Sequence, residues 1–224
     1  MQDRAETTRR AIVAAAAREF DRTGYAAASV AAIAAGAGCT TGALYFHFSG
    51  KDGVAAAVIR AHFAAWQPLT ARLEAVPAPA LERLVALSYA VVRAFRDDVV
   101  VRAGARLWNE RRSIDAELPV PFVAWITLAT ALLEQARAEG DLLPRVDCAE
   151  AASALVCALF GVHTVSDALD RRLLVEERLT GLWLLLLPGL LGRPEEPADF
   201  LHRSRAHDGS LSSVRPGSAR LSSV

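Results

Sequence analysis

Hydrophobic residues recur at helical spacing along most of this chain. Ile12, Ala16 and Phe20 follow one another at intervals of four in the segment 9–22, which predicts an amphipathic helix with one apolar stripe. A Thr-Gly pair then ends the stripe. Residues 51–191 also follow the helical period, with almost no alternation of the kind that marks β-strands. The pattern therefore predicts an all-α protein.

Two short helices follow the first one and are separated by a tight turn. Ser29 can cap the second helix, and Gly36 and Gly38 mark its end. Thr40 then opens the third helix. Two short helices joined by a turn that contains glycine are typical of a helix-turn-helix, whose second helix enters the major groove of DNA.

The third helix has two faces of different character. Leu44 and Phe48 lie four residues apart and share a face that can be buried, whereas Thr41 and Tyr45 share a polar face. The aromatic residues here could alternatively form a core cluster. We adopt that alternative for Phe46 and Phe48, because most large aromatic side chains are buried.

The polar residues of this region are the candidate contacts to DNA. Tyr45 and His47 can donate hydrogen bonds to phosphate oxygens, and Lys51, the single lysine of the chain, adds a full charge. Buried together, these three would need a partner for every polar tip, so we assign them to the phosphate backbone. Thr41 and Ala43 can reach base edges through a hydroxyl or a methyl group. The predicted DNA-binding set is Ser29, Thr40, Thr41, Gly42, Ala43, Tyr45, His47 and Lys51.

At these residues the chain resembles the TetR family of bacterial repressors. The likeness rests on the turn from Gly36 to Gly42, followed by Leu44-Tyr45, His47-Phe48 and Lys51. It implies a homodimer whose two heads bind a roughly palindromic operator in double-stranded DNA. Many relatives have lysine where Thr41 stands, so this position is expected to change the operator preference.

Composition narrows the classes of function. The 224 residues carry 25 basic and 25 acidic side chains, which does not fit a sequence-blind binder of nucleic acid. Three cysteines, Cys39, Cys148 and Cys157, lack metal-ligand spacing, so we expect no metal and no cofactor. Their odd number, and the lack of a signal peptide before the first helix, predict a cytoplasmic location. The apolar run 182–191 is too short to span a membrane, which takes about 20 residues. No membrane partner is therefore expected.

A helical body is expected to follow the head directly. Its helices are predicted near 52–66, 80–96, 99–110, 121–139, 148–169 and 173–187, with proline, glycine or charged pairs at most of the joints. We divide the chain into a helix-turn-helix domain (1–50), a ligand-binding and dimerisation domain (51–191) and a tail (192–224). The tail is rich in Ser, Arg, Pro and Gly and is predicted to be disordered.

The last two helices of this body carry apolar residues on nearly every side. Such helices are normally buried all round. A domain of this size cannot bury both of them completely, so a second copy is expected to cover them in a four-helix dimer interface.

Within the body the chain resembles the γ-butyrolactone autoregulator receptors of antibiotic-producing actinobacteria. The matching segments are 101–107, the stretch from Pro119 to Trp125, and Gly161-Val162. In that family the tryptophan that matches Trp125 lies over the bound lactone, so the resemblance implies a small hydrophobic effector and control of antibiotic or other secondary-metabolite genes. From the residues alone, Trp125 is better explained as a core tryptophan, and the resemblance is what favours a ligand contact.

Other aromatic and aliphatic residues are candidates for the wall of the same pocket. The predicted ligand-binding set is Trp125, His62, Leu87, Val91, Leu107, Trp108, Phe122, Phe160 and His163, with Phe95 beside them. Relatives commonly have glutamine where His62 stands, and often a small or polar residue in place of Phe160. An antibiotic-like molecule is therefore the alternative effector.

Two other functions compete with a ligand-responsive repressor. His62, Glu134, Cys157 and His163 could form a hydrolytic group through folding, but no nucleophile elbow, phosphate loop or metal motif accompanies them. We therefore assign no catalytic residue and expect no enzyme activity, such as turnover of a lactone. A binding protein whose head has lost its operator is the remaining alternative, because of Thr41.

Overall fold

Helices account for the regular structure of the residues that the computed structural model describes, which are 2–120, 122–207 and 211. An isolated β-bridge between Leu142 and Leu191 is the only extended pairing among them. The predicted all-α class is confirmed.

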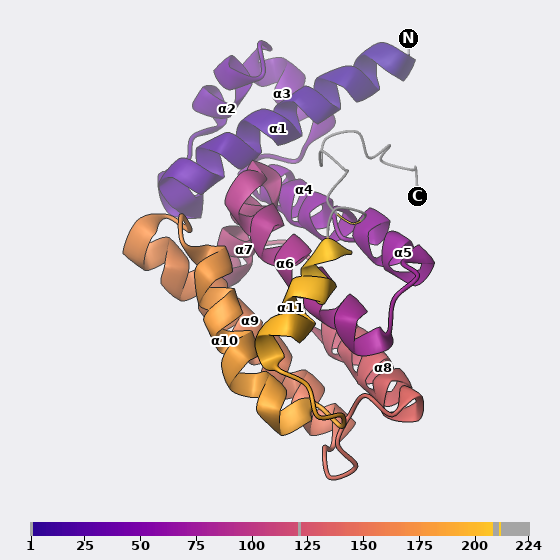
Figure 1. Ribbon diagram of the computed structural model, residues 1–224. Coiled ribbons are helices and arrows are strands. Elements are labelled where there is room, and N and C mark those ends of the chain that lie inside the picture. Colours follow the sequence, from indigo (N-terminus) through magenta and orange to yellow (C-terminus); the bar gives the residue numbers. More distant parts are fainter. Residues whose placement is uncertain (1, 121, 208–210, 212–224) are drawn as a thin grey trace. The chain divides into compact units, whose positions relative to one another are not determined.

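The helices divide between two compact units, and Figure 1 labels each of them. The first unit, residues up to 67 together with 98–119, contains α1 (Gln2–Ala27), α2 (Val30–Gly36), α3 (Thr41–His47), α4 (Lys51–Ala64), α7 (Val99–Asn109) and the short 3-10 turn η1 (Arg111–Ser113). The second unit contains α5 (Gln67–Ala75, from its second residue on), α6 (Ala80–Asp97), α8 (Val123–Glu139), α9 (Cys148–Asp170), α10 (Val175–Leu190) and α11 (Pro197–Ala206).

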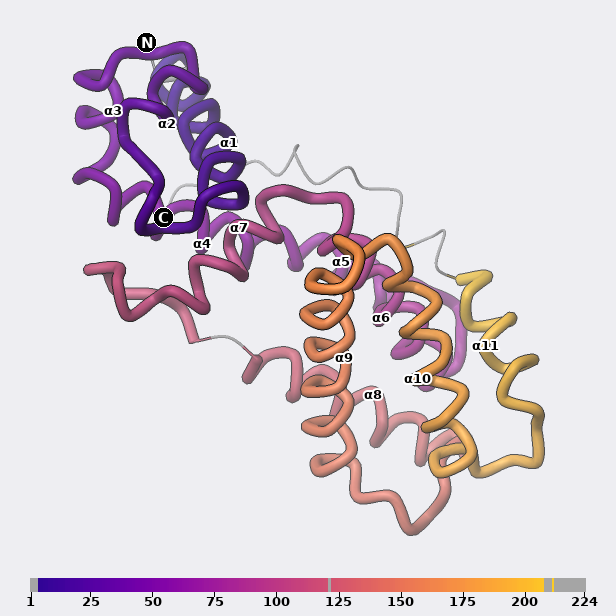
Figure 2. Tube along the Cα trace, turned by 90° about the vertical axis from the view of Figure 1, so that its left-hand side faces the viewer, coloured from indigo at the N-terminus to yellow at the C-terminus, as the bar shows by residue number. Residues whose placement is uncertain are grey.

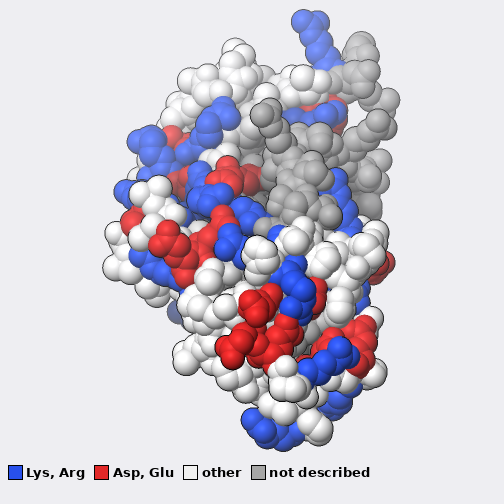
Figure 3. Space-filling model, viewed as in Figure 1, with Lys and Arg blue, Asp and Glu red and all other residues white. Residues whose placement is uncertain are grey.

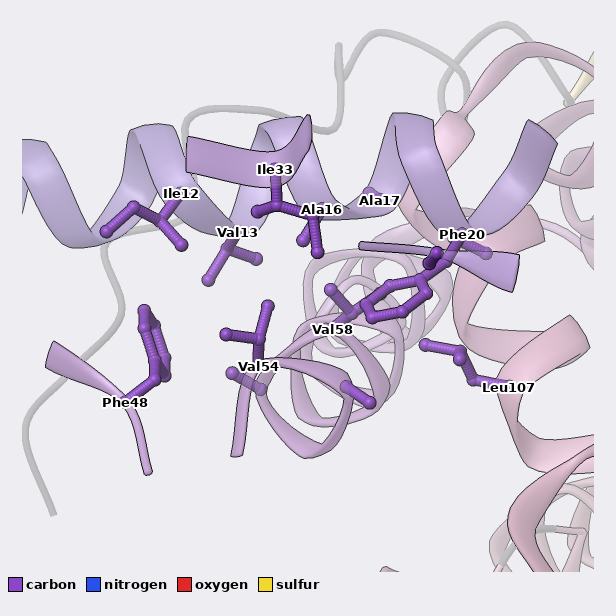
Figure 4. Packing of buried hydrophobic residues seen from close by; sticks show 14 of the residues in the cluster. Ile12, Val13, Ala16, Ala17, Phe20, Ile33, Phe48, Val54, Val58 and Leu107 are labelled. Carbon is purple, nitrogen blue, oxygen red and sulfur yellow. The ribbon is translucent and has the colours of Figure 1, made fainter. Parts of the chain in front are cut away.

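A contiguous apolar core holds the first unit together (Figure 4). Its fully buried members include Phe20 from α1, Ile33 from α2, Val58 from α4 and Leu107 from α7. Because α7 supplies part of this core, the compact unit extends beyond the predicted domain of residues 1–50. The division at residue 50 between a DNA-binding and a ligand-binding domain stays a prediction.

The first helix is longer than its apolar stripe. It begins at Gln2 and runs to Ala27, but Gly24, with φ of 78° and ψ of 177°, breaks the helical geometry inside it. This backbone conformation is open to glycine and strained for other residues. The predicted stop at Thr23-Gly24 therefore marks a kink, after which the chain adds one further short turn.

The pattern of the sequence misses α5. Proline at the second position of a helix is compatible with its first turn, so Pro68 does not prevent this one. Leu73 is the single buried residue of α5, and one anchor gives no recognisable period.

The prediction of a disordered tail over 192–224 is wrong for residues 197–206, which form α11. Phe200 and Leu201 are buried there, and α11 packs on α6 and α10. Two apolar residues in a polar stretch give no helical period, but burial against neighbouring helices stabilises the helix. The rest of the predicted tail from residue 208, except Leu211, lies outside the described residues.

Polar contacts also secure α11. Arg203 Nη2 lies 3.4 Å from Glu82 Oε1, and His207 Nε2 lies 3.0 Å from Oε2 of the same carboxylate. The Arg205 guanidinium lies over the ring of Tyr89, 4.8 Å from its centroid. Figure 3 shows basic and acidic groups interspersed over this face, in keeping with the formal net charge of zero.

α9 and α10 lie side by side (Figure 2) and keep apolar residues on their outer surface. Val165, Leu169 and Leu185 are exposed to 52, 67 and 76 %. Among the described residues, α9 is the only helix long and apolar enough to cross a membrane, and just 22 % of its most apolar stretch is buried. The exposed apolar surface of α9 and α10 marks a site of interaction.

α10 continues through Pro188 to Leu190, beyond the predicted end of this helix at residue 187.

Candidate DNA-binding and ligand-binding sites

The predicted helix-turn-helix forms at α2 and α3. Ser29 Oγ accepts a hydrogen bond from the amide of Ala32 at 3.0 Å, and Thr40 Oγ1 accepts one from the amide of Ala43 at 3.1 Å. Gly38, with φ of 66°, makes the turn between the two helices. Each helix therefore begins at its predicted cap, and each hydroxyl keeps its own hydrogen for a further acceptor.

The two predicted faces of α3 are present. Leu44 is fully buried and Phe48 is 7 % exposed, so both belong to the core of the first unit. Thr41 and Gly42 are exposed, and Tyr45 is 58 % exposed. Five of the residues assigned to DNA thus face solvent, namely Ser29, Thr40, Thr41, Gly42 and Tyr45, while Ala43, His47 and Lys51 are half-buried.

The assignment of Phe46 to the core is wrong, because its side chain is 83 % exposed. Phe46 lies two residues after Leu44, which places it about 200° round the helix from this buried residue, and Phe48 follows the helix in extended backbone. The spacing therefore excludes a place beside Leu44 in the core. Its ring meets the His47 ring edge to face, with centroids 5.3 Å apart. Phe46 joins the exposed face of α3 as a candidate contact.

Lys51 has structural partners. Its Nζ donates to the carbonyl oxygens of Tyr25 at 2.9 Å, Ala26 at 3.3 Å and Ala28 at 3.2 Å. It also lies 4.5 Å from the centroid of the Tyr25 ring. Three donors satisfy three carbonyl groups at the end of α1, so this ammonium joins the start of α4 to α1. Contact of Lys51 with a phosphate stays a prediction.

A second polar contact ties the same end of α1 to the chain beyond α7. The Tyr25 hydroxyl donates to Asp52 Oδ1 at 2.5 Å, and the amide of Asp115 donates to the same oxygen at 2.9 Å. Burial and the bond to Asp52 raise the pKa of Tyr25 to about 12, and the bond from Tyr25 lowers the pKa of Asp52. The start of α4 is thus fixed from two sides.

His62 lies in the first unit, where it joins α4 to α7. Its Nδ1 lies 2.9 Å from the carbonyl oxygen of Val101, and Trp66 Nε1 donates to its Nε2 at 3.4 Å. A carbonyl can only accept, so Nδ1 carries the proton and Nε2 is the acceptor. Burial lowers the pKa of His62 to about 4. The imidazole is therefore neutral and engaged with protein groups on both sides.

The pH dependence of folding should report this histidine. Because the pKa of His62 is about 4 in the folded chain and ordinarily 6.5, the unfolded chain binds a proton between these values that the folded chain does not. The free energy of unfolding is therefore expected to fall by about 2 kcal/mol between pH 7 and pH 5. Urea titrations at the two pH values measure the fall. A His62→Gln variant should lack it, and an equal fall in that variant would refute the assignment.

An apolar cavity lies in the second unit, between α6, α8, α9 and α10. Its lining residues are Leu84, Leu87, Ser88, Val91, Trp125, Ala129, Leu155, Val156, Leu159, Leu179, Leu182 and Trp183. Three residues of the predicted ligand-binding set, Leu87, Val91 and Trp125, are among them. The cavity volume is about 40 Å³, far below the roughly 300–1,000 Å³ of typical ligand sites, so a ligand must push its walls apart.

The other predicted pocket residues fall into two groups. Phe122, Phe160 and His163 form an aromatic cluster in the second unit with Phe95, whose ring stacks on that of His163 with centroids 3.9 Å apart. His62, Leu107 and Trp108 belong to the first unit. Leu107 is fully buried in its core, and Trp108 meets Phe63 edge to face.

Sequence reasoning missed the polar pair of the cavity wall, Ser88 and Trp183. In the sequence, Trp183 is only one residue of an apolar run, and a single serine in an apolar helix is not a signal for a polar site. The two residues are 95 positions apart, so no local pattern joins them. The described residues contain no group of three or more His, Cys, Asp or Glu side chains that could hold a metal ion.

A helix-turn-helix with an exposed second helix, joined to a helical unit with an apolar cavity, is the architecture of a DNA-binding regulator that responds to a ligand. A family model described as bacterial regulatory proteins of the tetR family matches residues 12–58, and one described as the tetracyclin repressor-like C-terminal domain matches residues 78–192. The A-factor receptor protein of Streptomyces griseus is 31 % identical over 215 residues, covering 96 % of this chain and 70 % of that protein. The chain belongs to the TetR family.

Solved structures show which proteins of this kind the chain is similar to. A structure described as the molecular basis for control of antibiotic production by bacterial hormones is 42 % identical, with a TM-score of 0.76 over 82 % of this chain and 97 % of its own. A γ-butyrolactone receptor (ArpA-like protein) is 30 % identical, with a TM-score of 0.74 over 92 and 98 %. CprB from Streptomyces coelicolor, in complex with its biological operator sequence, is 32 % identical, with a TM-score of 0.78 over 92 and 98 %. The resemblance predicted from the sequence is confirmed.

Proposed function

We propose that this protein is a homodimeric transcriptional repressor that leaves its operator when a small hydrophobic effector enters the cavity of the second unit. The observation that carries the proposal is the place of Trp125 in the wall of an apolar cavity, in a chain that also presents an exposed recognition helix. The relatives described as an A-factor receptor and as a γ-butyrolactone receptor support an effector of the γ-butyrolactone class. The relative described by control of antibiotic production supports target genes of that kind.

The exposed face of α3 is the proposed reading surface. Thr41 and Ala43 meet base edges, and Tyr45 and His47 hold phosphates, with Gly42 allowing close approach of the backbone. Ser29 and Thr40 offer hydroxyl hydrogens at two helix N-termini. The relative CprB was solved with its operator, which supports double-stranded DNA as the partner. A cytoplasmic location and the lack of a catalytic role belong to the same proposal, and binding to an operator supports the location.

The exposed apolar surface of α9 and α10 is assigned to a second copy of the chain. A lipid-spanning helix needs an apolar surface all round, whereas α9 exposes Ser153 and Thr164, and α10 exposes Glu177. A mixed surface of this kind fits a partner protein better than a bilayer. A dimer also supplies two reading heads for a palindromic operator.

Trp125→Ala is the variant that tests the link between cavity and operator. We expect it to bind operator DNA within about twofold of the wild type but to resist release, because it removes a ligand contact and no part of the reading head. If ligand weakens wild-type binding a hundredfold, the coupling free energy that the variant loses is about 2.7 kcal/mol. Fluorescence anisotropy on the promoter upstream of the gene, with and without a synthetic γ-butyrolactone, measures both quantities.

Trp108→Ala is the matched control, because Trp108 lies in the other unit and lines no part of the cavity. It should respond to ligand like the wild type. Loss of both DNA binding and ligand response in Trp125→Ala would show that Trp125 is a structural residue. Tight operator binding that no γ-butyrolactone weakens would support a repressor but favour an antibiotic-like effector. The sequence already offers this alternative, because Phe160 stands where relatives often have a small or polar residue.

A further inference from the structure

We propose that Ser88 and Trp183 form the polar subsite of the cavity, and that this pair selects an uncharged effector that presents a hydroxyl group as a hydrogen-bond donor. The inference rests on the proposed function, since it specifies the chemistry of the effector in the same cavity.

The two side chains meet inside the cavity wall. Trp183 Nε1 donates a hydrogen bond to Ser88 Oγ at 2.9 Å, and Ser88 Oγ donates to the carbonyl oxygen of Val85 at 2.6 Å. Ser88 is 5 % exposed and Trp183 is 3 % exposed. Both line the cavity, and they come from different helices, α6 and α10. Water has little access to either polar group, so an incoming ligand must meet their remaining hydrogen-bonding capacity.

The unused hydrogen-bonding capacity of Ser88 and Trp183 is one acceptor. A serine hydroxyl has one donor and two lone pairs, and an indole has one donor and no acceptor. Ser88 uses its donor on Val85 and one lone pair on Trp183, and Trp183 uses its only donor on Ser88. Among the described residues, the second lone pair of Ser88 Oγ has no partner. A ligand hydroxyl can donate to it without breaking either bond, whereas a ligand carbonyl finds no donor there.

The rest of the wall excludes charge. Apart from Ser88 and Trp183, the residues that line the cavity are Leu, Val and Ala side chains together with Trp125. A buried carboxylate or ammonium would lie against these without a counter-ion, which is far more costly than burial of a neutral group. The subsite therefore admits a neutral alkyl chain that carries an alcohol and rejects the corresponding acid.

A bond from serine to the carbonyl three residues earlier is common in helices, so the pair could serve packing alone. The experiment separates the two roles with three eight-carbon probes: 1-octanol, 2-octanone and sodium octanoate. Each is titrated calorimetrically into the full-length protein. We expect 1-octanol to bind about tenfold more tightly than 2-octanone, the worth of one hydrogen bond, and octanoate to show no measurable binding.

Ser88→Ala is the decisive variant, because it frees the Trp183 N–H and removes the acceptor. Its preference should reverse, with 2-octanone binding more tightly than 1-octanol. Ser88→Thr keeps a hydroxyl and should keep the wild-type order. Ser113→Ala, which changes an exposed serine of η1 in the other unit and outside the cavity wall, should change nothing. Thermal melts of each variant establish that it is folded.

Equal binding of alcohol and ketone by the wild type, an unchanged preference in Ser88→Ala, or binding of octanoate as tight as that of octanol would each overturn the proposal. Absence of binding by all three probes would overturn it too, because the cavity would then take no such ligand. Failure of the proposed function looks different. In that case 1-octanol binds with the expected preference but leaves affinity for operator DNA unchanged.

Discussion

Gly104→Ala is expected to lower the free energy of unfolding by about 3 kcal/mol or more. A Cβ atom at Gly104 would lie 2.2 Å from the Cβ of His62 and 2.7 Å from its Cγ. Neither Cβ can move without its backbone, so no change of rotamer relieves the contact. α4 and α7 must separate, and both contribute to the core of the first unit. Urea denaturation followed by circular dichroism at pH 7 measures the loss.

Two further variants identify the cause. Gly189→Ala is the matched control, because a Cβ there meets nothing within 4 Å, and helix propensity makes its change small or favourable by about 1 kcal/mol. In a His62→Ala background, Gly104→Ala should cost as much as in the wild type, since alanine retains the Cβ that is struck. Recovery in the double variant would show that the ring is the obstacle. A loss below about 1 kcal/mol in the single variant would contradict the close approach of α4 and α7.

Lys51→Met is expected to lower the free energy of unfolding by about 2–3 kcal/mol, because it removes three hydrogen bonds from a charged donor. The carbonyl oxygens of Tyr25, Ala26 and Ala28 lose their partner, and the start of α4 loses one of its attachments to α1. Affinity for operator DNA should fall in the same variant, because α4 directly follows the recognition helix α3 and loses an attachment. A tenfold fall corresponds to about 1.4 kcal/mol of binding free energy. Urea denaturation and anisotropy titrations, run on the same preparation, measure the two effects.

Tyr45→Phe is the comparison that separates structure from DNA contact. Its hydroxyl belongs to a 58 % exposed side chain, so its removal should leave stability within about 0.5 kcal/mol of the wild type. Affinity for the operator should still fall, and the salt dependence of binding should change little, because a neutral group is lost. If Lys51→Met instead behaves like Tyr45→Phe, with stability intact and affinity lost, then Lys51 is a phosphate contact and its role at the end of α1 is minor.

Much of the reading head could be predicted from the sequence because its signals are local. A cap bonds to an amide three residues on, as Ser29 does to Ala32 and Thr40 to Ala43. The stripe that buries Ile12 and Phe20 repeats every four residues. These interactions join residues only three or four positions apart. The helices, their caps and the turn between α2 and α3 can therefore be predicted from the sequence alone.

The pocket could be predicted only in part, because its members come from separate helices. Leu87, Val91 and Trp125 line one cavity. His62 and Leu107 have the same aromatic or aliphatic character, yet they belong to the packing of the first unit. Residue type could not tell these groups apart, since a core and a ligand pocket demand the same apolar side chains.

The sequence by itself determined an all-α chain, a capped helix-turn-helix with a polar face, and membership in a family, because helix periods, caps and motifs depend on neighbours within a few residues. The tertiary structure decided which polar atoms have partners. It joins the Lys51 ammonium to carbonyls more than 20 residues away and Trp183 to a serine 95 residues away. It also stabilises α11, whose own pattern predicts no helix. Packing between helices brings such groups together, and no local spacing along the chain encodes it.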